Sequence, residues 1–186
     1  YSMANYYVGL RGWQAFRALP AFPGGRFYSV LFVLIAFSYI IERIVGEYLP
    51  GTVNTALSIM GGTWMAILYY LVLFCVAVDL IRLADRFWVF IPAKWREDPA
   101  LAGSVVVALV ALIVAFGMWN AAHTVWRQYD IAIDKPAGGL RELKIILVTD
   151  IHLGKVVGNS RLESLVEAIN AREPDLVLLG GDVIDE

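Results

Sequence analysis

The sequence predicts a helical membrane region followed by the start of an α/β domain. Apolar residues make up 59% of the 186 residues and charged residues only 17%, far from the average of soluble domains. Nearly all of the apolar excess lies before residue 128. We expect three parts: an interfacial amphipathic segment over 1–26, a transmembrane anchor over 27–127, and an α/β part over 128–186.

The first part contains a short amphipathic pattern over 6–19. Such a helix lies in the membrane interface, with its apolar side in lipid and its charged side in water. Apolar residues that can face lipid alternate here with arginines that can reach water or headgroups: Leu10, Trp13 and Phe16 against Arg11 and Arg17. We therefore expect an interfacial helix that does not cross the bilayer.

Three apolar stretches, over about 27–47, 58–80 and 101–123, are each long enough to cross a hydrocarbon core of about 30 Å. The third includes the uncharged run 105–114, which no soluble helix would expose. The charged pair Glu42-Arg43 lies near the end of the first stretch, where it can anchor the helix at the interface or contact a substrate or partner. His123 ends the third stretch and is expected to be an interfacial histidine rather than a metal ligand.

Lys and Arg are distributed unevenly between the loops. The segment before the first span and the loop between the second and third spans lie on one side of the membrane, and they carry Arg11, Arg17, Arg26, Arg82, Arg86, Lys94 and Arg96. The segments on the other side carry Arg43, Arg127 and Lys135. Because the richer side of a membrane protein is usually cytoplasmic, residues 128–186 are expected outside the cytoplasm. No basic patch suggests a nucleic-acid partner, and the partner predicted by composition is the lipid bilayer.

The last part reads as strand, helix and strand. Side chains of different polarity alternate over 128–133, which predicts a first strand. Residues 143–148 form an apolar run typical of a strand buried on both faces. Ser160 and Glu163 have the spacing of a capping box, followed by an apolar stripe of Leu162, Leu165, Val166 and Ile169. A second apolar strand is expected over 176–179, parallel to the strand at 143–148.

Three possible metal ligands follow the two parallel strands. Asp150 and His152 come directly after one strand, and Asp182 comes directly after the next. In open α/β sheets, ligands bind beyond the carboxyl ends of the strands, so these side chains should meet, with Gly180 and Gly181 permitting a tight turn beside them. A lone Asp at such a place is more often a turn residue, but the three together favour a divalent cation.

The same residues resemble the calcineurin-like metallophosphoesterase family. The run Thr149-Asp150-Ile-His152 matches its D-x-H motif, and Gly181-Asp182-Val-Ile-Asp185 matches G-D-x-x-D. The resemblance implies an α/β sandwich domain and two divalent metal ions, of Mn, Fe or Zn type. It also implies that Asp150 and His152 bind the first metal and Asp182 bridges both. Asp185 would lie in the outer shell of the site or be a plain turn residue.

The anchor resembles the membrane-anchored bacterial branch of that family, which implies a bacterial cell membrane and a fourth span upstream of Trp13. The family's later motif G-N-H-[DE] and its other His-bearing motifs do not occur up to Glu186, so the histidine that protonates the leaving group is expected beyond it. We therefore expect a piece of a longer protein, incomplete at both ends, inactive by itself and weak in metal binding.

The function implied for the parent protein is two-metal hydrolysis of a phosphomonoester, a phosphodiester or a pyrophosphate linkage. Its substrate would be a phosphorylated small molecule or a lipid-linked phosphate, and other membrane proteins are possible partners. The alternative is a non-enzymatic membrane scaffold or accessory subunit of a larger membrane complex.

Overall fold

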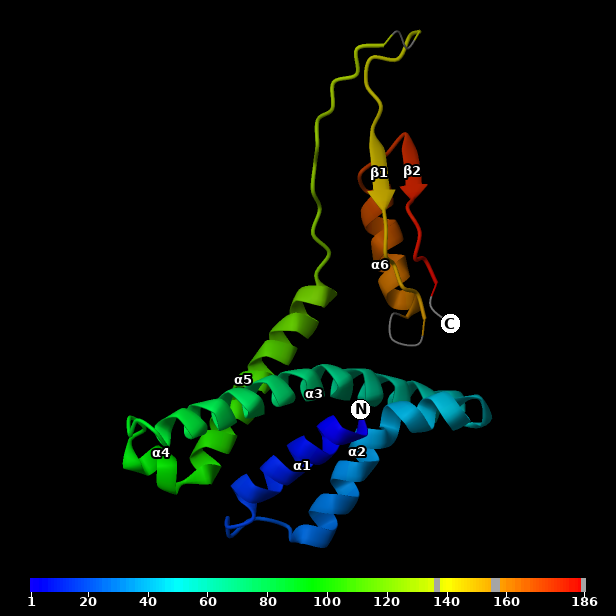
Figure 1. Cartoon of the computed structure of the whole chain (residues 1–186). Helices are drawn as coiled ribbons and strands as arrows, with labels where there is room; N and C mark the ends of the chain where they lie inside the picture. Colours follow the sequence, from blue (N-terminus) through cyan, green and yellow to red (C-terminus); the bar gives the residue numbers. More distant parts are fainter. Residues whose placement is uncertain (136–137, 155–157, 185–186) are drawn as a thin grey trace. The chain divides into compact units, whose positions relative to one another are not determined.

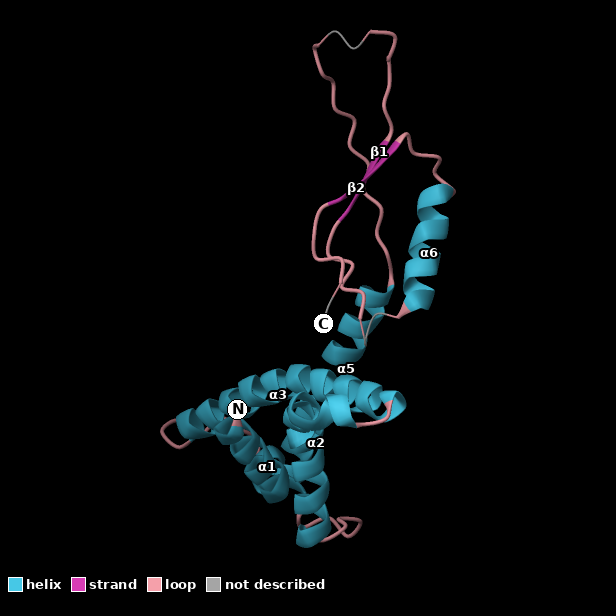
Figure 2. Cartoon of the chain, turned by 90° about the vertical axis from the view of Figure 1, so that its right-hand side faces the viewer, coloured by secondary structure: helices cyan, strands magenta, loops and turns pink. Residues whose placement is uncertain are grey.

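The computed structural model describes residues 1–135, 138–154 and 158–184, which form two compact units, Tyr1–Thr124 and Val125–Glu186. The first unit is helical throughout its regular structure (Figure 2). The second combines one helix with a two-stranded sheet (Figure 1).

Six helical segments build the first unit. They are α1 (Ser2–Phe16), α2 (Gly25–Val45), the 3-10 turn η1 (Gly46–Tyr48), α3 (Gly51–Asp85), α4 (Ala93–Glu97) and α5 (Pro99–Ala122). Among the described residues, α2, α3 and α5 are long and apolar enough to cross a membrane. At 35 residues, α3 is about 52 Å long, so it exceeds a bilayer core and must tilt or extend beyond it.

The core of this unit lies where α1, α2 and α3 meet. Val8, Ala36, Trp64 and Leu68 form one buried cluster. The indole N–H of buried Trp64 donates to Asn5 Oδ1 at 2.9 Å, which satisfies two polar groups inside the core. A Cβ at Gly61 would lie 2.7 Å from Tyr39 Cα. Glycine there lets α3 approach the α2 backbone closely, as small residues do between membrane helices.

α1 makes polar contacts with α3 and aromatic contacts with the turn that follows it. Arg11, expected to reach water or headgroups, donates from its guanidinium to Asp79 Oδ2 of α3 at 2.5 Å. Tyr7 Oη donates to the same oxygen at 2.6 Å. Trp13, expected to face lipid, stacks edge-on against Phe22 at 5.4 Å between ring centroids. The Arg11 side chain stays 38% exposed, so it still reaches solvent. Its contact with Asp79, 68 residues away in the sequence, lies beyond any helical periodicity.

The second unit is a strand, helix, strand arrangement. It consists of β1 (Ile145–Val148), α6 (Asn159–Asn170) and β2 (Leu176–Leu179). The strands are parallel, with Ile145 opposite Leu176 and Val148 opposite Leu179, as the sequence predicted. Ile146 and Ile169 are its buried apolar residues among those described. Most other strand residues stay exposed, including Leu147 at 65% and Leu179 at 60%.

Two local predictions for this unit are wrong. Residues 128–133 form no strand, and Ile131 and Ile133 are highly exposed. Alternation makes a strand possible, but a strand also needs a neighbour for its backbone hydrogen bonds. The expected capping box at Ser160 is absent as well, because α6 begins at Asn159 with Gly158 as its N-cap and no side-chain cap. Ser160 therefore lies within the first turn.

Candidate metal centre

The backbone brings the ends of β1 and β2 together. Gly180 N donates to Val148 O at 2.8 Å, Asp150 N to Gly181 O at 3.2 Å, and His152 N to Asp182 O at 3.0 Å. A parallel bridge between Leu153 and Ile184 continues the pairing. The two loops are thus joined by hydrogen bonds that do not involve the side chains of the candidate ligands.

Both glycines between β2 and Asp182 are required by their surroundings, as the sequence suggested. Gly181 has φ +109°, which an L side chain rarely adopts. A Cβ at Gly180 would lie 2.4 Å from the Thr149 methyl carbon Cγ2, a distance that real side chains do not reach. Glycine at both positions lets the β2 loop pass against Thr149 and turn toward Asp150.

The candidate ligands have an unusual backbone. Asp150, His152 and Asp182 have φ of 55°, 50° and 47°, in the left-handed region. Glu173 is the one other non-glycine residue with positive φ among those described. Asp and His tolerate this conformation better than most residues, yet it still costs about 1–3 kcal/mol for each. Such strain clusters at functional sites, which is an argument for function independent of residue type.

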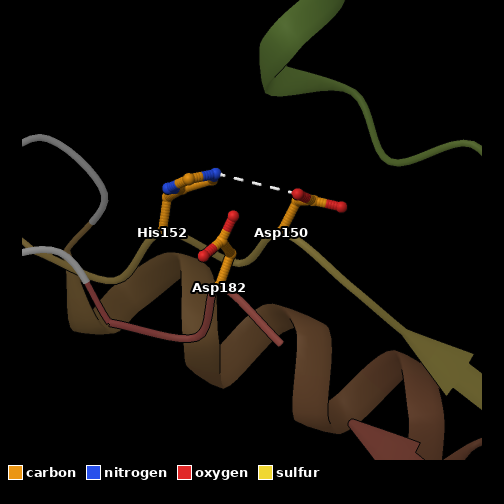
Figure 3. Close-up of side chains that lie close together, drawn as sticks. All are labelled: Asp150, His152 and Asp182. Atoms are coloured by element: carbon orange, nitrogen blue, oxygen red, sulfur yellow. Dashed lines mark ion pairs between the residues drawn. The ribbon is translucent and has the colours of Figure 1, made fainter. Parts of the chain in front are cut away.

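The three side chains converge on one space. One ligand atom from each lies within 4.8 Å of the others, and Figure 3 shows Asp182 directed between His152 and Asp150. His152 Nε2 lies 3.9 Å from Asp150 Oδ1, too far for a hydrogen bond. The side chains of His152 and Asp150 are 43% and 66% exposed. A small ligand can therefore reach the cluster from solvent.

The donor set and its spacing fit a divalent cation. Ligand bonds of about 2.0–2.2 Å require neighbouring ligand atoms to lie about 3.0–3.4 Å apart. The His152–Asp150 pair at 3.9 Å therefore needs less than about 1 Å of closure, and the whole set, within 4.8 Å, needs less than about 2 Å. The two carboxylates carry two negative charges, which one dication neutralises. One imidazole with two carboxylates suits Mn, Fe or Zn. Asp150, His152 and Asp182 would hold the ion, with positions left open for water or substrate.

The remaining sequence candidates lie elsewhere. Asp185 falls outside the described residues. The Nδ1–H of His123 donates to Trp119 O at 2.6 Å, so this histidine is used within its own helix end. Glu42 and Arg43 lie 4.0 Å apart at the end of α2, and the Arg43 guanidinium stands over the Tyr39 ring. Thr149 was missed by sequence reasoning; its methyl contact with Gly180 becomes visible only in the fold.

The helical unit and the site together define a class: a membrane protein with an α/β part whose strand ends gather metal-ligand side chains. Comparison with known proteins agrees with this class. The chain is 31% identical over 130 residues to a zebrafish (Danio rerio) "Transmembrane protein with metallophosphoesterase domain", covering 67% of this chain and 28% of that protein. A cattle (Bos taurus) protein of the same name is 30% identical over 87 residues, or 46% of this chain and 20% of that protein.

A bacterial relative matches a shorter stretch of the chain. The chain is 48% identical over 46 residues to an uncharacterised metallophosphoesterase of Helicobacter pylori, covering 25% of this chain and 12% of that protein. The chain thus spans less than a third of the length of these curated relatives. No family model and no solved structure matches the chain significantly. The relatives include animals and bacteria, so the bacterial branch stays a prediction.

Proposed function

We propose that the chain is part of a membrane-anchored, metal-dependent phosphoesterase. The observation that carries the proposal is the convergence of Asp150, His152 and Asp182, all with left-handed backbones, within 4.8 Å at the ends of two parallel strands. The names of its transmembrane and bacterial relatives support the same reaction class. The proposed substrates are phosphomonoesters, phosphodiesters or pyrophosphate linkages, and a lipid-linked phosphate is attractive because the protein is anchored in lipid.

The roles of the residues follow from their chemistry. Divalent cations, when bound, lower the pKa of coordinated water and neutralise charge on the phosphate oxygens. By the resemblance of its motifs to the metallophosphoesterase family, Asp150 and His152 would hold the first cation, and Asp182 would be a ligand of both cations. The pairing of the two loops through backbone hydrogen bonds fixes these donors before any ion arrives. Preorganisation of this kind lowers the cost of binding.

Three ligands do not complete two metal sites. We propose that further ligands and the proton donor to the leaving group come from elsewhere in the whole protein. The chain by itself is then expected to show no substantial turnover. The α/β part is proposed to lie outside the cytoplasm, on the basis of the Lys and Arg distribution between loops.

Assay of the whole protein tests the proposal. Hydrolysis of p-nitrophenyl phosphate and of bis-p-nitrophenyl phosphate is measured before and after EDTA, and again after Mn²⁺ is restored. We expect chelation to abolish activity, Mn²⁺ to restore it, and D182N to remain inactive throughout. D175N is the matched control, because Asp175 accepts from Lys144 N and takes no part in the cluster. Activity that survives both EDTA and D182N would exclude this function.

A further inference from the structure

A cavity of about 210 Å³ lies among α1, α2, α3 and α5 of the helical unit. Most of its lining is apolar and includes Phe32, Leu71, Cys75 and Val106. Apolar cavities of about 150 Å³ remain dry and bind a molecule the size of benzene. This cavity is therefore large enough for a short segment of hydrocarbon chain. Its lining residues on α3 run from Leu71 to Arg82, about 16 Å along the helix axis.

One part of the lining is charged. Arg11, Asp79 and Arg82 contribute two guanidinium groups and one carboxylate, which leaves one net positive charge. Arg11 is bound to Asp79, whereas Arg82, in the last turn of α3, makes no ion pair among the described residues. The cavity thus joins an apolar interior to an excess of positive charge.

Arg11 also carries an unmatched donor. Its Nε is buried and has no hydrogen-bond partner among the described residues. A buried donor without an acceptor costs about 1–3 kcal/mol. An anionic oxygen beside Arg11 and Arg82 would provide that acceptor and balance the extra charge. This observation is independent of the cavity's volume and points to the same kind of ligand.

We propose that this cavity binds an anionic phospholipid, with a segment of acyl chain between the helices and the phosphate beside Arg11 and Arg82. The apolar wall excludes a purely polar ligand such as free phosphate, and the net positive charge favours an anionic headgroup over a zwitterionic one. Lipid is also the molecule that surrounds α3 and α5 if they cross a membrane. The bound lipid would fasten α1 to α3 and α5.

Cys75 provides the test, because it is the chain's single cysteine and lines the cavity. The rate of its alkylation by N-ethylmaleimide is measured with the full chain in nanodiscs of phosphatidylcholine, with or without phosphatidylglycerol. We expect phosphatidylglycerol to slow alkylation about fivefold, as a ligand at four times its Kd would. R82Q should abolish the protection and R82K should retain it.

R86Q is the matched control, because Arg86 caps the same helix but does not line the cavity. If phosphatidylglycerol slowed alkylation equally in R82Q and R86Q, the surface potential of the disc, and not a bound lipid, would be the cause. That result would overturn the proposal. So would equal rates in the two lipids, or equal protection by inorganic phosphate in phosphatidylcholine discs. If R82Q does not fold, native mass spectrometry of the wild-type chain in an equimolar lipid mixture decides. Enrichment of phosphatidylglycerol supports the site, and its absence refutes it.

Discussion

Replacement of Asp182 by Asn should make the metal-free protein more stable while weakening metal binding. Asn tolerates the left-handed backbone of Asp182, at φ 47°, about as well as Asp does. The substitution therefore removes a charge without changing local strain. It leaves the backbone acceptor that binds His152 N at 3.0 Å in place.

The size of the effect follows from the spacing of the carboxylates. Two negative charges within 4.8 Å of each other repel by about 0.9 kcal/mol in water when they are at that limit. Screening at physiological salt reduces this to about 0.5 kcal/mol. Loss of a direct ligand should weaken cation binding about 100-fold or more, because loss of a mere supporting residue already costs 10–100-fold.

Hydrogen exchange measures both effects in the full chain. In EDTA at low salt, the amides of Asp150, His152 and Leu153 should exchange about fivefold more slowly in D182N than in the wild type, since 1.4 kcal/mol corresponds to a factor of ten. Added Mn²⁺ should slow exchange in the wild type and have almost no effect in D182N. Faster exchange in metal-free D182N, with an unchanged response to Mn²⁺, would refute the reasoning and give Asp182 a structural role.

Two further predictions concern the surroundings of the site. G180A should destabilise the α/β unit and weaken Mn²⁺ binding, because its Cβ would lie 2.4 Å from Thr149 Cγ2. The double variant G180A/T149S lacks that methyl group and should recover both stability and Mn²⁺ binding. Failure to recover them would show that this contact is not the cause. R172A should change the fluorescence emission of Trp126, because the guanidinium carbon of Arg172 lies 3.7 Å from the centroid of that ring. Loss of this contact should cost about 0.5–1 kcal/mol in local stability. T52A, in the helical unit, is the control, and unchanged Trp126 emission in R172A would exclude the contact.

The sequence predicted the elements whose signals are local and repeated. Apolar length identified α2, α3 and α5, and the apolar runs identified β1 and β2 with their parallel pairing. The position of Asp150, His152 and Asp182 after those strands was enough to predict that they converge. A general property of parallel sheets, that their carboxyl ends share an edge, carried this prediction.

Features set by contacts distant in the sequence were not predictable. The left-handed backbones at Asp150 and Asp182 depend on pairing between two loops, which includes the Leu153–Ile184 bridge. The ion pair between Arg11 and Asp79 depends on how α1 packs on α3. The alternation over 128–133 could not show whether a neighbouring strand would be present to pair with it.

The central claim is that Asp150, His152 and Asp182 form one divalent-cation site. The most direct measurement is paramagnetic broadening of backbone amide signals in the full chain during titration with Mn²⁺, which detects even weak binding. We predict that broadening centres on residues 150–153 and 180–183 and disappears in D182N, with D175N behaving as wild type. Broadening centred on other carboxylates, or broadening at this site that persists unchanged in D182N, would contradict the claim.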